Sequence, residues 1–315
     1  SVKSHIFSDE QRFTETDMAN FVPAHPIAGS ERSGYSAAVD DLFEGRNVIL
    51  TPHSGNSAVT VGAVNLLWRE LGANVLGMTS VRHDEVLAAT SHLPHLLAYA
   101  IVDVLLRQEQ SEDIFRYAAG GFADFSRLAS SDAKMWSDIF VANSSSVEKV
   151  LDDYIRSLLE FREVIRERDR ESLKESFQRA KQTRENFISQ HFQPKKQVEM
   201  TSNQRNFTVQ PGGSVAGAIR VAGDKSISHR AIILASIANG ITRVSGFLEG
   251  EDALNTVAAF REMGVTIVGP ENGELTIYGV GKLGLQAPRK PLYMGNSGTA
   301  MRLLAGLLAA QNFDS

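Results

Sequence analysis

Hydrophobic residues recur with two different spacings along the chain, and the changes between them divide it into regions. Between residues 20 and 80, short runs typical of strands surround one amphipathic helix. The strands are predicted at 20–28, 46–53 and 73–80, and the helix at 57–72, where Gly72 occupies the position of a C-cap glycine. This alternation favours part of a parallel, doubly wound sheet.

From residue 82 to about 191 the strand pattern disappears, and long runs with helical periodicity replace it. The clearest helix is predicted to begin at Ser145, because Ser145 and Glu148 have the spacing of a capping box. Its apolar stripe requires a partner surface. The charge-dense segment at 166–186 is predicted to be a solvated helix face.

Periodicity lapses again in the polar, proline-containing segment HFQPKKQVEMTSNQRN, which has the composition of a linker. After it, strand-like runs at 207–213, 218–223, 241–247, 265–269 and 274–281 alternate with helical runs at 229–239 and 251–263. Both helical runs end near a glycine before a β-branched run, as successive copies of one unit would. The predicted regions are 1–80, 81–191, the linker 192–204, and 205–315.

Composition restricts the partners and the chemistry. The 315 residues carry a formal net charge of −5 and no cysteine, so neither a nucleic-acid partner nor a disulfide or thiolate site is expected. The longest apolar runs are shorter than a membrane span, so we expect no membrane and a cytoplasmic protein. The first residues resemble no signal peptide and include no initiating Met, which indicates a start cut from a longer chain.

Three histidines and an arginine in the first half are candidates for chemistry. His25 ends a predicted strand, at an edge where α/β sheets bind ligands, and an imidazole there can accept a proton from a substrate hydroxyl. His92 and His95 are neighbours on a helix, yet no acidic or cysteine cluster accompanies them, so no metal site is predicted. Arg127 can hold a carboxylate through two hydrogen bonds. Each residue alone is more often structural.

Taken together, HPIAGSE, HDEVLAATSHLPH, GGFADFSRLASSDAKMW and the opening SVK resemble the prephenate and cyclohexadienyl dehydrogenase family over about residues 1–190. The resemblance implies that His25 polarises the ring hydroxyl of prephenate or arogenate while NAD takes the hydride and carbon dioxide leaves. It implies that Arg127 holds a substrate carboxylate. Other substrate-binding positions implied by the resemblance are Ser1, Ser30, Glu31, His92, His95 and Trp136. The helical region would be the dimerisation domain, giving a homodimer.

The chain departs from this family in its cofactor motif. The glycine fingerprint G-x-G-x-x-G does not occur at the N-terminus, so the NAD site is expected mostly upstream of Ser1. Ala123 occupies a position that is often basic in relatives, which leaves prephenate or arogenate open as the substrate.

Two further segments combine cations with helix N-termini. GDKSISHR at 223–230 places Lys225 before a predicted helix, and GNSGTAMR at 295–302 repeats the design with convergent backbone amides. Helix N-termini favour anions. Each segment alone is more often a helix cap with a surface arginine, but two such cradles suit a substrate that carries phosphate and carboxylate groups.

With FLEGEDALNT between them, these segments resemble the enolpyruvylshikimate-phosphate (EPSP) synthase family over about residues 204–315. The resemblance implies binding of shikimate 3-phosphate and phosphoenolpyruvate, with Lys225 reaching both and no cofactor. Substrate-binding positions implied by it are Lys225, Ser226, Arg230, Asn296, Gly298, Thr299 and Arg302. Ser297 and Leu303 depart from the residues found in many relatives.

The sequence therefore predicts a bifunctional fusion of a prephenate/cyclohexadienyl dehydrogenase (C-terminal part) and an EPSP synthase (N-terminal part), both truncated. The predicted fold is an α/β remnant of a Rossmann-like sheet, then an all-α dimerisation domain, then a partial α/β lobe of βαβαββ units. Two alternatives remain open: a non-catalytic dimerisation or regulatory module, and another dehydrogenase of the 2-hydroxy-acid type.

Overall fold

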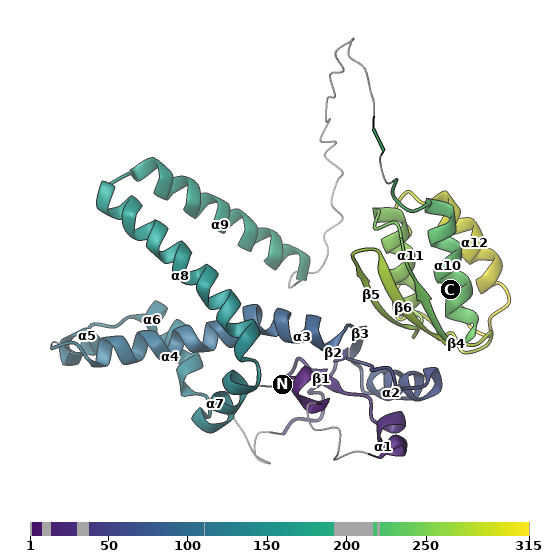
Figure 1. The fold of residues 1–315 in the computed structure, drawn as a ribbon, viewed down its shortest axis with the longest axis horizontal. Helices are drawn as coiled ribbons and strands as arrows, with labels where there is room; N and C mark the ends of the chain where they lie inside the picture. Colours follow the sequence, from purple (N-terminus) through teal and green to yellow (C-terminus); the bar gives the residue numbers. More distant parts are fainter. Residues whose placement is uncertain are drawn as a thin grey trace, which may run out of the picture. The chain divides into compact units, whose positions relative to one another are not determined.

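A computed structural model describes residues 2–7, 14–29, 38–109, 111–191, 217–218 and 221–314 (Figure 1). Contacts divide the chain into two compact units, residues 1–148 with 221–315 and residues 149–220. Each unit is described by itself.

The first α/β region is built around the parallel strands β2 and β3, connected by helix α2. Its elements are η1 (Ser4–Phe7), α1 (Glu15–Asn20), β1 (Ala24–Pro26), β2 (Asn47–Leu50), α2 (Ala58–Glu70) and β3 (Asn74–Gly77). Val48 pairs with Val75 in the parallel ladder, and both are buried. The prediction of a parallel sheet is wrong for β1, which runs antiparallel to β2 and pairs His25 with Ile49. Gly72 follows α2 with a φ of 84°, as a C-cap glycine does.

Helices follow from Ser80 to His191, which confirms the predicted helical region. They are α3 (Ser80–Leu87), the π-helical turn η4 (Ala88–His92), α4 (Leu93–Leu106), α5 (Ser111–Arg116), α6 (Gly120–Ser126), η5 (Arg127–Ser130), α7 (Ala133–Ala142), α8 (Ser144–Glu167) and α9 (Arg170–His191). By length and composition alone, the helical stretch Ser80–Leu106 could cross a membrane. It is longer than the apolar runs from which the sequence analysis predicted no membrane span. It also carries buried Asp84 and His92, which belong to a polar cluster.

Two sequence predictions for α8 and α9 are corrected. The helix α8 begins at Ser144, so Ser145 lies inside it; the backbone oxygen of Asn143 accepts the first hydrogen bond, from Val147. The charged segment 166–186 is not one helix, because Arg168 adopts a positive φ of 57° and Asp169 starts α9 by accepting from the Ser172 backbone N–H.

The last α/β region packs three helices with an antiparallel sheet. Its elements are α10 (Lys225–Ile237), β4 (Asn239–Val244), α11 (Glu251–Glu262), β5 (Thr266–Glu271), β6 (Glu274–Val280) and α12 (Gly298–Leu308). β6 pairs with both β4 and β5, and the core contains Ile232, Phe260 and Ile277. One pair, Gly77 with Val268, connects β3 to β5.

Most of the chain between α9 and α10 lies outside the described residues. The run at 207–213 and the predicted linker 192–204 lie outside the described residues. Of the run at 218–223, the described residues form no strand.

Candidate functional site

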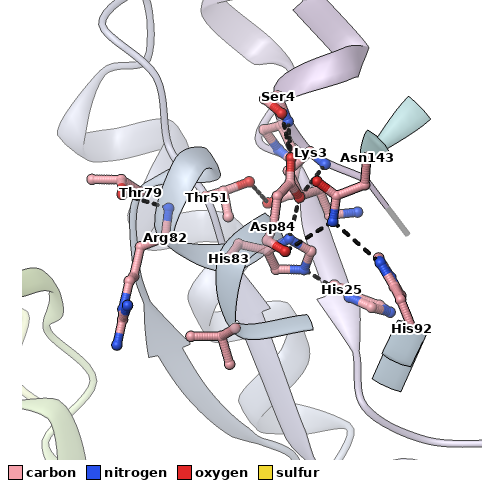
Figure 2. Close-up of polar contacts among 12 residues, drawn as sticks. Lys3, Ser4, His25, Thr51, Thr79, Arg82, His83, Asp84, His92 and Asn143 are labelled. Atoms are coloured by element: carbon pink, nitrogen blue, oxygen red, sulfur yellow. Dashed lines mark hydrogen bonds and ion pairs between the residues drawn. The ribbon is translucent and has the colours of Figure 1, made fainter. Parts of the chain in front are cut away.

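The first candidate site is organised around the buried carboxylate of Asp84, in the first turns of α3 (Figure 2). Asp84 accepts the backbone N–H groups of Lys3 and Ser4 at 2.8 Å each, and the Ser4 hydroxyl as well. Its Oδ1 lies 2.7 Å from His83 Nδ1. Burial alone would raise the pKa of Asp84, but the hydrogen bonds from His83, Ser4 and Lys3 outweigh it and lower the pKa to about 2. Asp84 is therefore an ionised acceptor.

His25 joins this cluster from β1. Its Nδ1 lies 2.8 Å from His83 Nε2, and the two rings are tilted with centroids 5.0 Å apart. Burial is the largest cause that lowers the pKa of His25, to about 3. At neutral pH the imidazole of His25 is uncharged, so it can accept a hydrogen bond through one ring nitrogen.

Asn143, which follows α7, connects Asp84 to His92. Its side-chain nitrogen donates to the Asp84 backbone oxygen at 2.9 Å and lies 3.2 Å from His92 Nδ1. The side chain of His92 is fully buried, and burial lowers its pKa to about 4. His92 is therefore neutral as well.

The cluster continues from His92 to an aromatic and cationic end. The rings of His92 and Trp136 meet edge to face at 5.9 Å, and His95 stacks on Trp136 at 3.7 Å. His95 Nδ1 donates to the Ser91 backbone oxygen at 2.8 Å. Burial lowers the pKa of His95 most, and the nearby Arg127 cation lowers it further. Contacts thus connect the predicted residues His25, His92, His95 and Trp136, and Arg127 lies near enough to His95 to affect its pKa.

Other predicted residues cannot be placed, and some participants were missed. Ser1, Ser30 and Glu31 lie outside the described residues. Five members of the cluster were not predicted as site residues: Lys3, Ser4, His83, Asp84 and Asn143. The sequence offered no clear signal for them, because His83 and Asp84 lie within the largely polar helix segment SVRHDEVL. Among the described residues, no group of three or more His, Asp or Glu could hold a metal ion.

The second candidate site begins at the N-terminus of α10. Lys225 forms an ion pair with Asp252 of α11, whose side chain is only 16% exposed, against 49% for Lys225. The first-turn amides are not all available to a ligand, because the Asp224 carboxylate accepts from the Ile227 backbone N–H at 2.7 Å. Ser226 is half-buried and Arg230 is exposed.

The N-terminus of α12 supplies the other half of this site. Ser297 caps the helix by accepting from the Ala300 backbone N–H at 3.2 Å. Asn296, Gly298 and Arg302 are exposed and Thr299 is half-buried, and a Cβ added at Gly298 would meet no atom within 4 Å. In the described part of the chain, neither Arg230 nor Arg302 has an ion pair. These residues leave open space beside a helix N-terminus.

A buried histidine that the sequence did not indicate connects the two helix N-termini. His229 of α10 is 0% exposed, and its Nδ1 lies 2.8 Å from Thr256 Oγ1 of α11. Its Nε2 lies 3.4 Å from Ser297 Oγ at the start of α12. The side chain of His229 therefore fixes α10, α11 and α12 with respect to one another.

Both regions that contain a candidate site match known protein families. Residues 1–77 match the prephenate dehydrogenase nucleotide-binding domain, and residues 79–179 match the prephenate dehydrogenase dimerization domain. Residues 209–315 match EPSP synthase (3-phosphoshikimate 1-carboxyvinyltransferase). These are soluble enzymes of aromatic amino-acid biosynthesis.

Individual proteins agree with these matches but extend beyond them. The 3-phosphoshikimate 1-carboxyvinyltransferase of Nitrosococcus oceani is 60% identical over 116 residues, which are 37% of this chain and 26% of that protein. That of Hydrogenovibrio crunogenus is 63% identical over 113 residues, 36% of this chain and 25% of that protein. Prephenate dehydrogenase from A. aeolicus, solved in complex with hydroxyphenyl propionate and NAD+, is 39% identical with a TM-score of 0.52, covering 54% of this chain and 59% of that one. The chain thus spans about a quarter of the length of the two curated synthases and 59% of the A. aeolicus dehydrogenase.

The order of the two enzymes requires a correction. The assignment of the dehydrogenase as the C-terminal part and the synthase as the N-terminal part is wrong as an order along this chain, because the dehydrogenase matches occupy 1–179 and the synthase match 209–315. The predicted fold, a nucleotide-binding α/β part followed by a helical dimerisation domain and a partial synthase region, is confirmed. The chain consists of prephenate dehydrogenase domains followed by part of an EPSP synthase domain, with both enzymes only partly represented.

Proposed function

We propose that this chain belongs to a bifunctional enzyme that oxidatively decarboxylates prephenate or arogenate and transfers an enolpyruvyl group to shikimate 3-phosphate. One observation carries the dehydrogenase half: unbroken contacts join His25, through His83, Asp84 and Asn143, to His92. A neutral imidazole at one end and the Arg127 cation near the other suit a substrate with a hydroxyl and a carboxylate.

The low pKa of His25 matches the charge that this reaction creates. When hydride leaves the carbon that bears the ring hydroxyl, positive charge develops on the hydroxyl oxygen. The bond to the ring carboxylate then breaks, its electron pair makes the ring aromatic, and carbon dioxide departs. The hydroxyl keeps its proton, so an uncharged acceptor such as His25 stabilises the transition state through a hydrogen bond.

The carboxylate end of the substrate would lie toward Trp136, His95 and Arg127. Trp136 is 6% exposed, and its indole N–H has no hydrogen-bond partner among the described residues. A buried donor without a partner is costly, so a substrate oxygen is a suitable acceptor for it. Arg127 would add charge-assisted hydrogen bonds.

The dinucleotide would accept the hydride, but this chain shows little of its site. The described residues of 2–77 contribute β2, α2 and β3 and contain no glycine fingerprint. We therefore derive no contact with NAD; NAD as the cofactor is proposed from the nucleotide-binding domain match and from the NAD+ bound in the A. aeolicus relative.

For the synthase half, two capped helix N-termini with Lys225, Arg230 and Arg302 support the binding of phosphate and carboxylate groups. Lys225 is held by Asp252, which orients its ammonium group. Gly298 leaves room beside these cations for a small acid such as phosphoenolpyruvate.

Assembly and domain limits are also proposals. The dimerization-domain match and the exposed apolar residues Ile155, Leu158 and Ile165 on α8 support a homodimer through the helical domain. We propose boundaries near residues 80, 191 and 204, and a cytoplasmic location.

His25→Asn in the full-length protein tests the dehydrogenase proposal. Loss of the acceptor should reduce kcat for prephenate-dependent NADH formation by about 100-fold or more. His53→Asn is a matched control, because His53 bonds to Phe21 and Gly55 outside the cluster; its turnover should be unchanged. Normal kcat in His25→Asn would remove His25 from the mechanism.

Arg127→Ala tests the carboxylate role separately. Removal of the cation should raise the KM for prephenate about tenfold and change kcat less, since the contact is made in the ground state too. An unchanged KM would contradict the carboxylate role.

A further inference from the structure

Hydrogen-bond directions around Asp84 can be derived from chemistry. An ionised carboxylate only accepts, so His83 Nδ1, at 2.7 Å from Asp84 Oδ1, must carry a hydrogen. The same carboxylate already accepts from two backbone N–H groups and the Ser4 hydroxyl. The buried ammonium of Lys3, whose pKa burial lowers and Asp84 raises, contributes the compensating charge. Asp84 therefore does not require an imidazolium at His83.

The position of the hydrogen on His83 determines which ring nitrogen of His25 is protonated. If His83 carries a single ring hydrogen, which Asp84 holds on Nδ1, its Nε2 has a lone pair, and this atom lies 2.8 Å from His25 Nδ1. One of these two nitrogens must donate, so His25 carries its hydrogen on Nδ1. The Nε2 of His25 is then an acceptor.

Asn143 sets the opposite arrangement at His92. Its Nδ2 bonds to the Asp84 backbone oxygen, which can only accept, so this atom is the amide donor. The second contact of Nδ2 is His92 Nδ1 at 3.2 Å, which must therefore be the unprotonated nitrogen. The hydrogen of neutral His92 is on Nε2.

We propose that His83 with Asp84, and Asn143, hold His25 and His92 in opposite tautomers, so that His25 offers an acceptor to the substrate hydroxyl and His92 a donor to a substrate carboxylate. This inference rests on the proposed dehydrogenase function. Figure 2 shows the continuous path of contacts from Lys3 and Ser4 through Asp84 to both histidines. His83, Asp84 and Asn143 act as positioning residues, because they determine the orientation and protonation of the imidazoles.

Fixed tautomers give the site a specificity that a mobile imidazole lacks. A buried acceptor without a partner is penalised, so an analogue without the ring hydroxyl leaves His25 Nε2 unpaired. Sites built to bind a substrate hydroxyl reject analogues that lack it by factors on the order of 10⁴. The network therefore selects an acid that carries a hydroxyl.

Nitrogen-15 NMR of the whole chain, labelled at histidine, tests the inference at neutral pH. Long-range correlations should show His25 protonated on Nδ1 and His92 protonated on Nε2, each as a single tautomer. Either histidine in the reverse form, or as a mixture of both forms, would overturn the proposal without any variant being made.

Two variants separate positioning from packing. Asn143→Ala should turn the His92 signal into a tautomer mixture and leave His25 unchanged, whereas the control Asn74→Ala, which removes an amide bonded to the Gly45 backbone oxygen, should change neither. His83→Phe should release His25 from the Nδ1–H form. Single unchanged tautomers in both network variants would show that these residues only pack.

Hydroxyphenyl propionate, added to the same sample, distinguishes this inference from the proposed function. If both histidines have the predicted tautomers but the His25 nitrogen signals do not shift when the ligand is added, the network proposal stands and the substrate site is contradicted. If the His25 signals shift but the tautomers are reversed, the substrate site is supported and the network proposal is overturned.

Discussion

The two candidate sites of this chain differ in how their polar groups are arranged. In the dehydrogenase region, buried imidazoles lose their charge and become directional hydrogen-bonding groups around Asp84. In the synthase region, Arg230 and Arg302 remain exposed beside helix N-termini. A site that must recognise a hydroxyl requires fixed hydrogen-bond direction, whereas a site for phosphate and carboxylate groups requires positive charge near open space. Substitutions should therefore affect folding more strongly in the first site.

The largest effect is expected from Asp84→Ala. The change leaves two backbone N–H groups, the Ser4 hydroxyl and His83 Nδ1 without their acceptor, and the buried Lys3 without its counter-charge. The free energy of unfolding should fall by about 3 kcal/mol. A urea titration followed by Trp136 fluorescence, in a Trp68→Phe background, measures this region.

Asp152→Ala is the matched control, because Asp152 is exposed on α8. Its free energy of unfolding should change by less than about 0.5 kcal/mol. Equal effects of the two substitutions would show that the Asp84 cluster does not stabilise the fold.

A smaller effect is expected from His229→Ala. It opens a cavity and leaves Thr256 and Ser297 without a buried partner, which should cost about 2 kcal/mol. Because Ser297 caps α12, hydrogen exchange at the Ala300 amide should also accelerate. His229→Asn retains a donor and an acceptor and should restore part of the protection from exchange. If the Ala300 amide of His229→Ala exchanges as slowly as that of the unmodified chain, the three helices are held independently of His229.

The smallest effect is expected from Gly298→Ala. The added Cβ meets no atom, so the free energy of unfolding should change by less than about 0.5 kcal/mol. Gly279→Ala is the contrasting control, since its Cβ would run into the backbone oxygens of Ala235 and Ala238. Thermal denaturation of both variants measures the difference, and a large loss at Gly298 would mean that the space beside α12 is not open.

Local features could be predicted from the sequence because their causes are local. The C-cap position of Gly72 and the periodicities of α2, α10 and α11 depend on residues a few positions apart. The prediction failed at Arg168, where a positive φ and the cap formed by Asp169 divide what the charge pattern presents as one helix. β1 also differs from the prediction: its three residues pair with β2 alone in the described sheet, and the pairing is antiparallel.

The composition of the sites was predicted less completely than the fold. His25 and Arg127 were predicted from their motifs, but His83, which contacts His25, lies 58 positions away in sequence. Asn143 is 59 positions from Asp84. A histidine next to an aspartate, or a lone asparagine after a helix, gives no sign in sequence of what it will contact. The tertiary fold creates these pairs.

The central claim is that the fold keeps His25 neutral and directional, and its own titration tests this most directly. An unfolded imidazole titrates near pH 6.5, whereas burial lowers the pKa of His25 in the folded chain to about 3. Between these values only the unfolded state takes up the proton, so acidification should also reduce stability. Nitrogen-15 NMR of His25 across this range should show an uncharged ring at pH 5; a midpoint near 6.5 in the folded chain would contradict the account.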